Sequence, residues 1–280
     1  QADRAFGACW RRGNALGGRL LAKGLSPQSA RRLMLIVRRA SQRLEALVPS
    51  TAKVLDRIRQ RVDDLSQSFA ECLDFFDAAE PFVGPSSYFH HKALAARLPH
   101  NSIASLLQDD LFFDWLYATL TAWGLHRMGP GNTKLRDISE LKASFRQQAD
   151  AIEELAPLTI TSQDAELTAR KIWAVLSSLR VSIAEAQIVA NSKALHHVLP
   201  RLVPHIDREY TFNFFYNRNN LSISEDEAFV EMYAEFHRLA VGNIQEIVSR
   251  IGKGWHTSES KVIDNAIVGY MLRQRRSLPT

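Results

Sequence analysis

The chain has 280 residues, an apolar fraction of 46% and a formal net charge of +5. This length and apolar content suffice for a substantial hydrophobic core, in one large domain or two small ones. No apolar run approaches the roughly 18 residues that cross a bilayer, and the two cysteines form neither a disulfide framework nor a cysteine zinc pattern. We therefore expect a globular protein of a reducing compartment, the cytoplasm.

The positive charge is concentrated near the N-terminus. Ten Lys and Arg side chains and two acidic ones give residues 1–48 a charge of +8, which leaves −3 for residues 49–280. A basic arm suits nucleic acid, an acidic partner or an anionic membrane surface. The same composition is also typical of a tag, an over-translated leader or a transit peptide, and the first methionine is Met34. We predict a basic N-terminal arm or leader over 1–48 and a single all-helical domain over 49–280.

Apolar residues recur at helical spacing through the first half of the chain. The longest of these patterns follows the break at Pro49, and Pro81 with the cluster at 84–87 ends it. The segment after Asn101 or Ser102, either of which can serve as its N-cap, is apolar on most faces and predicts a central buried helix. The helices predicted in this half are 29–47, 52–79, 87–97 and 103–127.

The second half continues in the same way. Ser224 followed by Glu227 has the spacing of a capping box, and basic residues from Arg273 onward suit the C-terminal end of a last helix. The helices predicted here are 137–155, 163–179, 192–199, 224–251 and 258–273. Because no alternating strand pattern, βαβ rhythm or repeat occurs, the predicted class is all-α, with about nine or ten helices.

The segment 188–217 is the richest in polar and aromatic groups. Over 163–217 the expected order is a helix, a turn, a second helix and an extended entry to Asp207, and this order resembles the helix-hairpin-helix DNA glycosylase superfamily. The pattern SK-x-LH…P…D, which includes Lys193, also resembles a group of bacterial sequences. The resemblance implies a hairpin that offers backbone N–H groups to a DNA phosphate. It also implies that Asp207 is an acid/base or charge stabiliser and that Lys193 is a phosphate clamp or attacking amine.

The neighbourhood of these two residues is basic. Between residues 186 and 223 the acids are Asp207 and Glu209, against four Lys and Arg residues and three histidines. We expect His196, His197 and Arg208 to contact the ligand.

A purely structural interpretation of the same segment stays open. Asp207 precedes a predicted helix and has the position of an N-cap. In that interpretation Lys193 faces solvent, and His196 or His197 fills a half-buried position. Adjacent residues on a helix point about 100° apart, so we expect at most one of the two histidines to face any one site.

A second candidate lies at 123–135. The superfamily hairpin is a Gly-hydrophobic-Gly turn, whereas this chain has Ile188 to Asn191 at the corresponding place. Gly129-Pro130-Gly131 has the glycine spacing instead, and His126, Arg127 and Lys134 around it are expected to support ligand binding. These glycines are equally explained as the end of a helix.

Motifs for other chemistries are absent from the sequence. A metal site would need distant histidines such as His90 or His91 to converge with His126 and His196 or His197, and no metal-ligand spacing such as HExxH occurs. No phosphate-binding loop, nucleophile elbow or dinucleotide motif is found. We predict no cofactor and no metal, and a histidine between aromatic neighbours such as His90 is typical of a packed position.

Two functions remain as hypotheses. The first is a helical protein that binds DNA or another phosphate-bearing ligand, with glycosylase-like chemistry at Asp207 and Lys193. The second is a non-enzymatic helical interaction or regulatory protein, in which these groups fix helix packing. The sequence does not indicate an oligomeric state.

Overall fold

The structure is a computed structural model that describes residues 54–125 and 133–276. Backbone contacts divide the chain into two units, Gln1–Arg57 and Ile58–Thr280, and the second holds the elements from α3 onward. Between residues 58 and 276, apart from the gap at 126–132, the secondary structure is helical with two isolated β-bridges, which confirms the all-α class. None of the described helices combines the length and the apolarity needed to traverse a bilayer. The predicted arm 1–48 and its helix at 29–47 lie outside the described residues.

Several predicted helices occur as two or more segments. The elements are a helix over 54–67, α3 (Phe69–Ala79), α4 (Pro85–Arg97), α5 (Ile103–Leu106), α6 (Asp110–Leu120), the π-helical turn η1 (Thr121–Leu125), α7 (Ile138–Gln147), α8 (Ala149–Leu155), α9 (Ala165–Ser178), α10 (Ile188–Val198), α11 (Thr211–Tyr216), α12 (Glu225–Gly242), α13 (Ile244–Arg250) and α14 (Glu259–Arg276).

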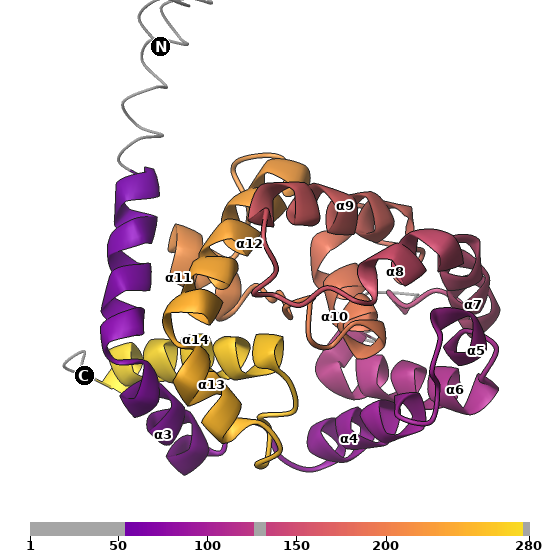
Figure 1. The fold of residues 1–280 in the computed structure, drawn as a ribbon, viewed down its shortest axis with the longest axis horizontal. Coiled ribbons are helices and arrows are strands. Elements are labelled where there is room, and N and C mark those ends of the chain that lie inside the picture. Colours follow the sequence, from indigo (N-terminus) through magenta and orange to yellow (C-terminus); the bar gives the residue numbers. More distant parts are fainter. Residues whose placement is uncertain (1–53, 126–132, 277–280) are drawn as a thin grey trace, which may run out of the picture. The chain divides into compact units, whose positions relative to one another are not determined.

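Helix α10 lies between two groups of helices (Figure 1). In one group α4 packs on α6 and η1. In the other, α12 packs on α9, and α14 packs on α3, α11, α12 and α13. Because α10 contacts α4, α6 and α9, side chains on its different faces reach both groups.

The crossing of α3 and α14 depends on Gly269. A Cβ atom at this position would lie 1.9 Å from the carbonyl oxygen of Cys72, far inside van der Waals contact. Glycine therefore allows α14 to lie against the backbone of α3. This crossing is deep in the core, since α14 is buried continuously from Ser260 to Gly269.

The predicted central helix at 103–127 is wrong in two respects. It is divided into α5, α6 and η1, and Leu111 on α6 is 56% exposed, so the segment has a solvent face. The division comes from a local cap: Asp109 Oδ1 accepts the N–H of Leu111 at 2.8 Å and starts α6 afresh. The expected cap at Ser102 is confirmed, because its hydroxyl accepts the N–H of Ser105 at 3.1 Å.

Three further predictions of continuous helix also fail. The helix predicted over 52–79 is interrupted at Ser68, the one over 137–155 at Gln148, and the one over 224–251 at Asn243. The capping box at Ser224 is not formed: Ser224 is the N-cap of α12, but its side chain makes no capping hydrogen bond.

Candidate functional site

Helix α10 carries three of the predicted site residues and begins earlier than expected. We predicted a turn as far as residue 191 and a short helix over 192–199, whereas α10 spans Ile188–Val198. Lys193 therefore lies in the middle of the helix and not at its N-terminus.

The early start of α10 has a tertiary cause. Glu225 Oε2, from the first turn of α12, accepts the backbone N–H groups of Gln187 at 2.9 Å and Ile188 at 3.2 Å. A carboxylate at a helix N-terminus occupies the place where a phosphate would bind. The hairpin contact that the resemblance implies would therefore require a phosphate to displace Glu225.

Buried Asn191 fixes α10 against α9. Its amide Nδ2 donates to the carbonyl oxygens of Leu176 at 2.7 Å and Leu179 at 3.0 Å, at the C-terminal end of α9. Asn191 thus supplies a partner for the Leu179 carbonyl, which follows the end of α9, and a second donor for the Leu176 carbonyl, which also accepts the N–H of Leu179. The consequence for the site is that the position of Lys193, half a turn further along α10, is held by a neighbouring helix.

The segment 199–207 folds back along α10. His196 Nδ1 donates to the carbonyl of Val203 at 2.7 Å, and the N–H of Ile206 donates to Ser192 Oγ at 3.3 Å. This return brings the ring of His205 within 3.7 Å of the ring of His196, centroid to centroid. The segment covers a face of α10 that an isolated helix would leave open.

Both adjacent histidines consequently enter one cluster, and our expectation that only one of them could do so is wrong. His196 and His197 are fully buried, and so is His90 on α4. The ring centroid of His90 lies 6.2 Å from that of His196 and 5.1 Å from that of His197. Neighbours on several sides of α10 make this possible, which the rotation per residue alone does not reveal. His90 is packed, as expected, but it is packed against other histidines.

Hydrogen-bond partners fix the tautomers of two of these rings. His197 Nδ1 must donate, because its partner at 2.8 Å is the carbonyl oxygen of Lys193. Its Nε2 then accepts from His90 Nδ1 at 3.0 Å, and His90 Nε2 accepts the hydroxyl of Thr257 at 3.1 Å. Both imidazoles are neutral in this chain of bonds, whereas protonation of both rings would place a proton on each of the two nitrogens that face one another.

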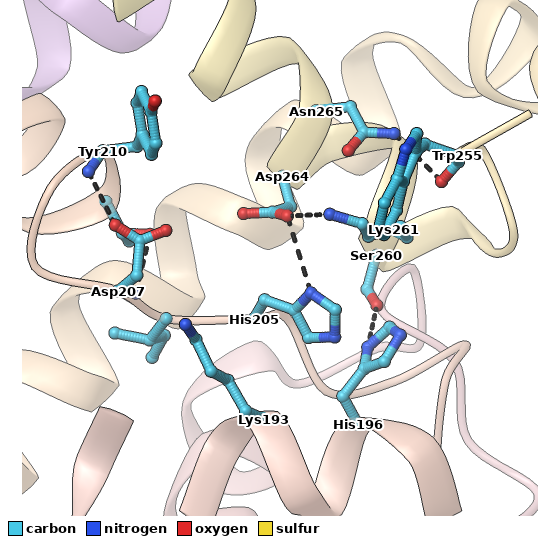
Figure 2. A network of polar contacts seen from close by, with 12 residues as sticks. Lys193, His196, His205, Asp207, Tyr210, Trp255, Ser260, Lys261, Asp264 and Asn265 are labelled. Carbon is cyan, nitrogen blue, oxygen red and sulfur yellow. Dashed lines mark hydrogen bonds and ion pairs between the residues drawn. The ribbon is translucent and has the colours of Figure 1, made fainter. Parts of the chain in front are cut away.

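Lys193 reaches out of this layer toward Asp207 and Asp264 (Figure 2). Its side chain is half-buried, its ammonium lies 5.6 Å from the ring centroid of Trp123 on η1, and it donates no hydrogen bond to any residue that the structure describes. Asp207 is also half-buried, and its Oδ1 accepts the N–H of Tyr210 at 2.6 Å. Asp207 therefore caps the turn before α11, as in the structural interpretation, and still lies beside Lys193.

A buried ion pair on α14 completes the site. Lys261 Nζ donates to Asp264 Oδ2, and His205 Nδ1 lies 3.6 Å from the same oxygen. The Lys261 ammonium is enclosed by aromatic rings, 5.3 Å from the centroid of Trp255 and 5.5 Å from that of Phe82. A buried charge is tolerated only with such partners.

Burial sets the protonation of the whole cluster. It lowers the pKa of His90, His196 and His205 well below the ordinary value, and that of His197 to about 4, with the nearby lysine Lys261 acting in the same direction. The histidines are therefore neutral at physiological pH, in agreement with their tautomers.

The charged residues around them are shifted as well. Burial lowers the pKa of Lys193, and the carboxylates of Asp207 and Asp264 act against this change. Burial raises the pKa of Asp264, while Lys261 opposes the rise. Groups with shifted pKa values in one place are typical of functional sites, although packed ion pairs show them too.

A search for relatives gives no assignment. No family model, curated protein or solved structure matches the chain. The function is therefore inferred from the residues and their geometry alone.

The described histidines are not arranged as a set of metal ligands. Among the described residues, no group of three His, Cys, Asp or Glu side chains is arranged to hold a metal ion. His197 Nδ1 and His196 Nδ1 are committed to backbone carbonyls. His196 Nε2 and His205 Nε2 are buried and have no hydrogen-bond partner within the described part of the chain.

The remaining predicted site residues fall outside the cluster. Arg208 and Lys134 are exposed, and no contact of either side chain with the cluster is found within the described ranges. His126, Arg127 and the glycine turn at 129–131 lie outside the described residues. The structure therefore brings together Lys193, His196, His197 and Asp207; the two histidines are fully buried, and Lys193 and Asp207 are half-buried.

Several members of the site were not predicted from the sequence, namely His205, Lys261 and Asp264, and His90 was considered only as a metal ligand or a packed residue. One available signal was the pair Lys261 and Asp264, three residues apart on α14 and on either side of the apolar residues Val262 and Ile263. Two opposite charges between buried positions on one helix indicate an internal pair, and such a pair requires a polar region around it.

Another polar cluster, on the surface, is explained by helix capping. His100 donates from Nε2 to Asp109 Oδ2 at 2.8 Å and accepts the hydroxyl of Ser105 at Nδ1, 2.9 Å away. Asp109 is already the N-cap of α6. His100 thereby orients this cap and joins the ends of the short helix α5.

Proposed function

We propose that the chain binds a phosphate-bearing ligand, nucleic acid in the first place, and acts on it through Lys193 and Asp207 in the manner of a DNA glycosylase. One observation carries the proposal: Lys193 is a half-buried amine beside a carboxylate, and no described residue accepts its hydrogen bonds. Burial lowers its pKa and so raises the fraction of free amine at a given pH. A free amine is the reactive form of lysine.

The chemistry available to such an amine is addition to an electrophilic carbon. At the aldehyde of an abasic sugar, the nitrogen of Lys193 forms the new bond, the carbonyl oxygen leaves as water, and the product is an imine. Asp207 Oδ1 accepts the N–H of Tyr210, and Asp207 Oδ2 has no hydrogen-bond partner among the described side chains and amides. This oxygen is therefore available to accept a proton or to stabilise positive charge on the sugar.

The surroundings support a nucleic-acid ligand. Exposed Arg208 directly follows Asp207 and supplies a cation for a phosphate. The half-buried ring of Trp123 lies beside the Lys193 ammonium, and an aromatic face of this kind can stack on a base. The amides at the start of α10 do not contribute, because Glu225 occupies them.

Binding tests the proposal. We expect fluorescence anisotropy to show that the chain binds short single-stranded and abasic duplex DNA at low salt, and that affinity falls as salt is added. Lys193→Ala should weaken binding by about tenfold, equivalent to about 1.4 kcal/mol, whereas Lys171→Ala, at an exposed position on α9, should not. No binding at low salt, where phosphate contacts are strongest, would end the proposal.

A second candidate function is favoured by the interior of the site. His90, His196 and His197 are fully buried and hydrogen-bonded to one another, to Thr257 and to backbone carbonyls, as expected of groups that fix helix packing in an interaction or regulatory protein. DNA binding and thermal unfolding together separate the two candidates. Lys193-dependent binding at low salt supports the first, and a chain that binds no DNA and whose melting temperature falls in His197→Gln supports the second.

A further inference from the structure

Asp264 has an unsatisfied oxygen in the interior of the protein. The side chain is only 5% exposed, its Oδ2 receives Lys261, and its Oδ1 is buried without a hydrogen-bond partner in the described part of the chain. Leaving a buried carboxylate oxygen unpaired is costly. An attraction between this oxygen and a nearby cation would offset that cost.

The Lys193 ammonium is a cation near Asp264 that has no hydrogen-bond acceptor among the described residues. It extends from α10 toward the carboxylates of Asp264 and Asp207 (Figure 2) and makes no hydrogen bond to a described residue. The order of charges is alternating, from Asp207 to Lys193 to Asp264 to Lys261. Opposite charges at each step stabilise such an arrangement when water is largely excluded.

We infer that Asp264 is a positioning residue of Lys193: its carboxylate, whose Oδ1 is buried and unpaired among the described residues, attracts the Lys193 ammonium toward the interior without a direct hydrogen bond (Figure 2). This inference deepens the proposed function, on which it rests for the use made of the amine. Asp207, which is half-buried and already engaged by Tyr210, remains the group that faces the ligand.

Lys261 has a separate part in this arrangement. Its ammonium is confined between the rings of Phe82 and Trp255 and bonds Asp264 Oδ2. The bond opposes the effect of burial on the pKa of Asp264, and it engages Oδ2, which leaves Oδ1 as the oxygen without a partner. Lys261 thus orients Asp264 without facing the ligand.

Among the residues that the structure describes, two anionic neighbours affect the protonation of Lys193, Asp207 from the return segment and Asp264 from α14, and Lys261 is the cation that opposes them. The other titratable groups packed around it are neutral imidazoles: His196 and His197 on its own helix, His205 on the return segment and His90 on α4. Trp123 on η1 is uncharged.

Competitive labelling with acetic anhydride tests the inference without any nucleic acid. Acetylation of Lys193 is quantified by mass spectrometry from pH 6 to pH 11 and expressed relative to exposed Lys171 of the same chain. In Asp264→Asn, which keeps the shape of the side chain, loss of the anion should shift the Lys193 profile toward lower pH by about one unit. Labelling of Lys193 near neutral pH would then rise about tenfold, while Lys171 stays unchanged.

A profile that is unchanged in Asp264→Asn but shifted in Asp207→Asn would overturn the inference. If Asp264→Asn does not fold, Asp264→Asn with Lys261→Met removes both charges of the pair, a replacement that folds often tolerate. In this double variant the labelling profile of Lys193 should still shift toward lower pH, but by less, because Asp264 affects the pKa of Lys193 more than Lys261 does. A shift toward higher pH contradicts the inference. A normal labelling shift in a chain that binds no DNA would reject the proposed function and leave the role of Asp264 intact.

Discussion

His90 Nδ1 lies 3.0 Å from His197 Nε2, although 107 positions separate the two residues in the chain. The bond joins α4 to α10 and requires a proton on one of the two facing nitrogens but not on both. Protonation of the pair would place two cations in contact in the interior, near Lys261. The packing of these helices is therefore linked to pH.

Stability should fall on acidification below about pH 6.5. The pKa of His197 is lowered from 6.5 in the unfolded chain to about 4 in the folded one, so between these values the unfolded state binds more protons. The contribution of His197 is complete above pH 6.5 and is lost as pH falls toward 4, by about 3 kcal/mol in total. His90, His196 and His205 are shifted in the same direction.

Urea unfolding between pH 4.5 and pH 7.5 measures this dependence. His197→Gln removes one titrating group, and the slope of the unfolding free energy against pH should become shallower even if the variant is less stable overall. A slope equal to that of the unsubstituted chain would show that His197 is not among the groups responsible.

Gly269→Ala should be severely destabilising. The added Cβ would meet the Cys72 carbonyl oxygen at 1.9 Å and its carbon at 2.9 Å, both of them backbone atoms, so α3 and α14 must move apart. We expect a loss of more than about 2 kcal/mol in unfolding free energy.

Gly242→Ala is the matched control. Gly242 is also helical, and a Cβ there would have Ser66 Oγ as its nearest neighbour at 3.7 Å, an ordinary contact. This substitution should leave stability unchanged or raise it by up to about 1 kcal/mol, because alanine favours helix. Equal losses at the two positions would contradict the close crossing of α3 and α14.

Glu225 should contribute more to the stability of the fold than its neighbour Glu227. Both belong to the first turn of α12, but only Glu225 accepts the amides at the start of α10. Glu225→Ala is expected to lower the unfolding free energy by about 1–2 kcal/mol, and Glu227→Ala, at an exposed position, by less than about 0.5 kcal/mol. Chemical denaturation of the two variants measures both losses. Equal losses of unfolding free energy would mean that the cap of α10 does not stabilise the fold.

The fold class and many helix positions follow from the sequence because they depend on local periodicity. The apolar stripe from Ile58 to Phe76 is buried as its spacing predicts, and the last helix begins and ends close to the expected residues. The start of α10 was missed because its cap, Glu225, is 37 residues away in the chain. No local pattern contains that information.

The site was predictable to the extent that its members are close in sequence. Lys193 and Asp207 are fourteen residues apart, and their proximity follows from a helix and a return segment. His90, Lys261 and Asp264 come from α4 and α14, and their convergence depends on how those helices pack on α10. Periodicity shows which face of a helix is buried, but it does not show which helix covers it.

Borohydride trapping tests the central claim, that Lys193 is the reactive amine of the protein. The chain is incubated with abasic-site duplex DNA and sodium borohydride, which reduces an imine to a stable covalent adduct, and the modified peptide is identified by mass spectrometry. The account predicts one adduct at Lys193, absent in Lys193→Ala and retained in Lys171→Ala. An adduct on any other lysine, or none where the chain binds the DNA, would contradict it.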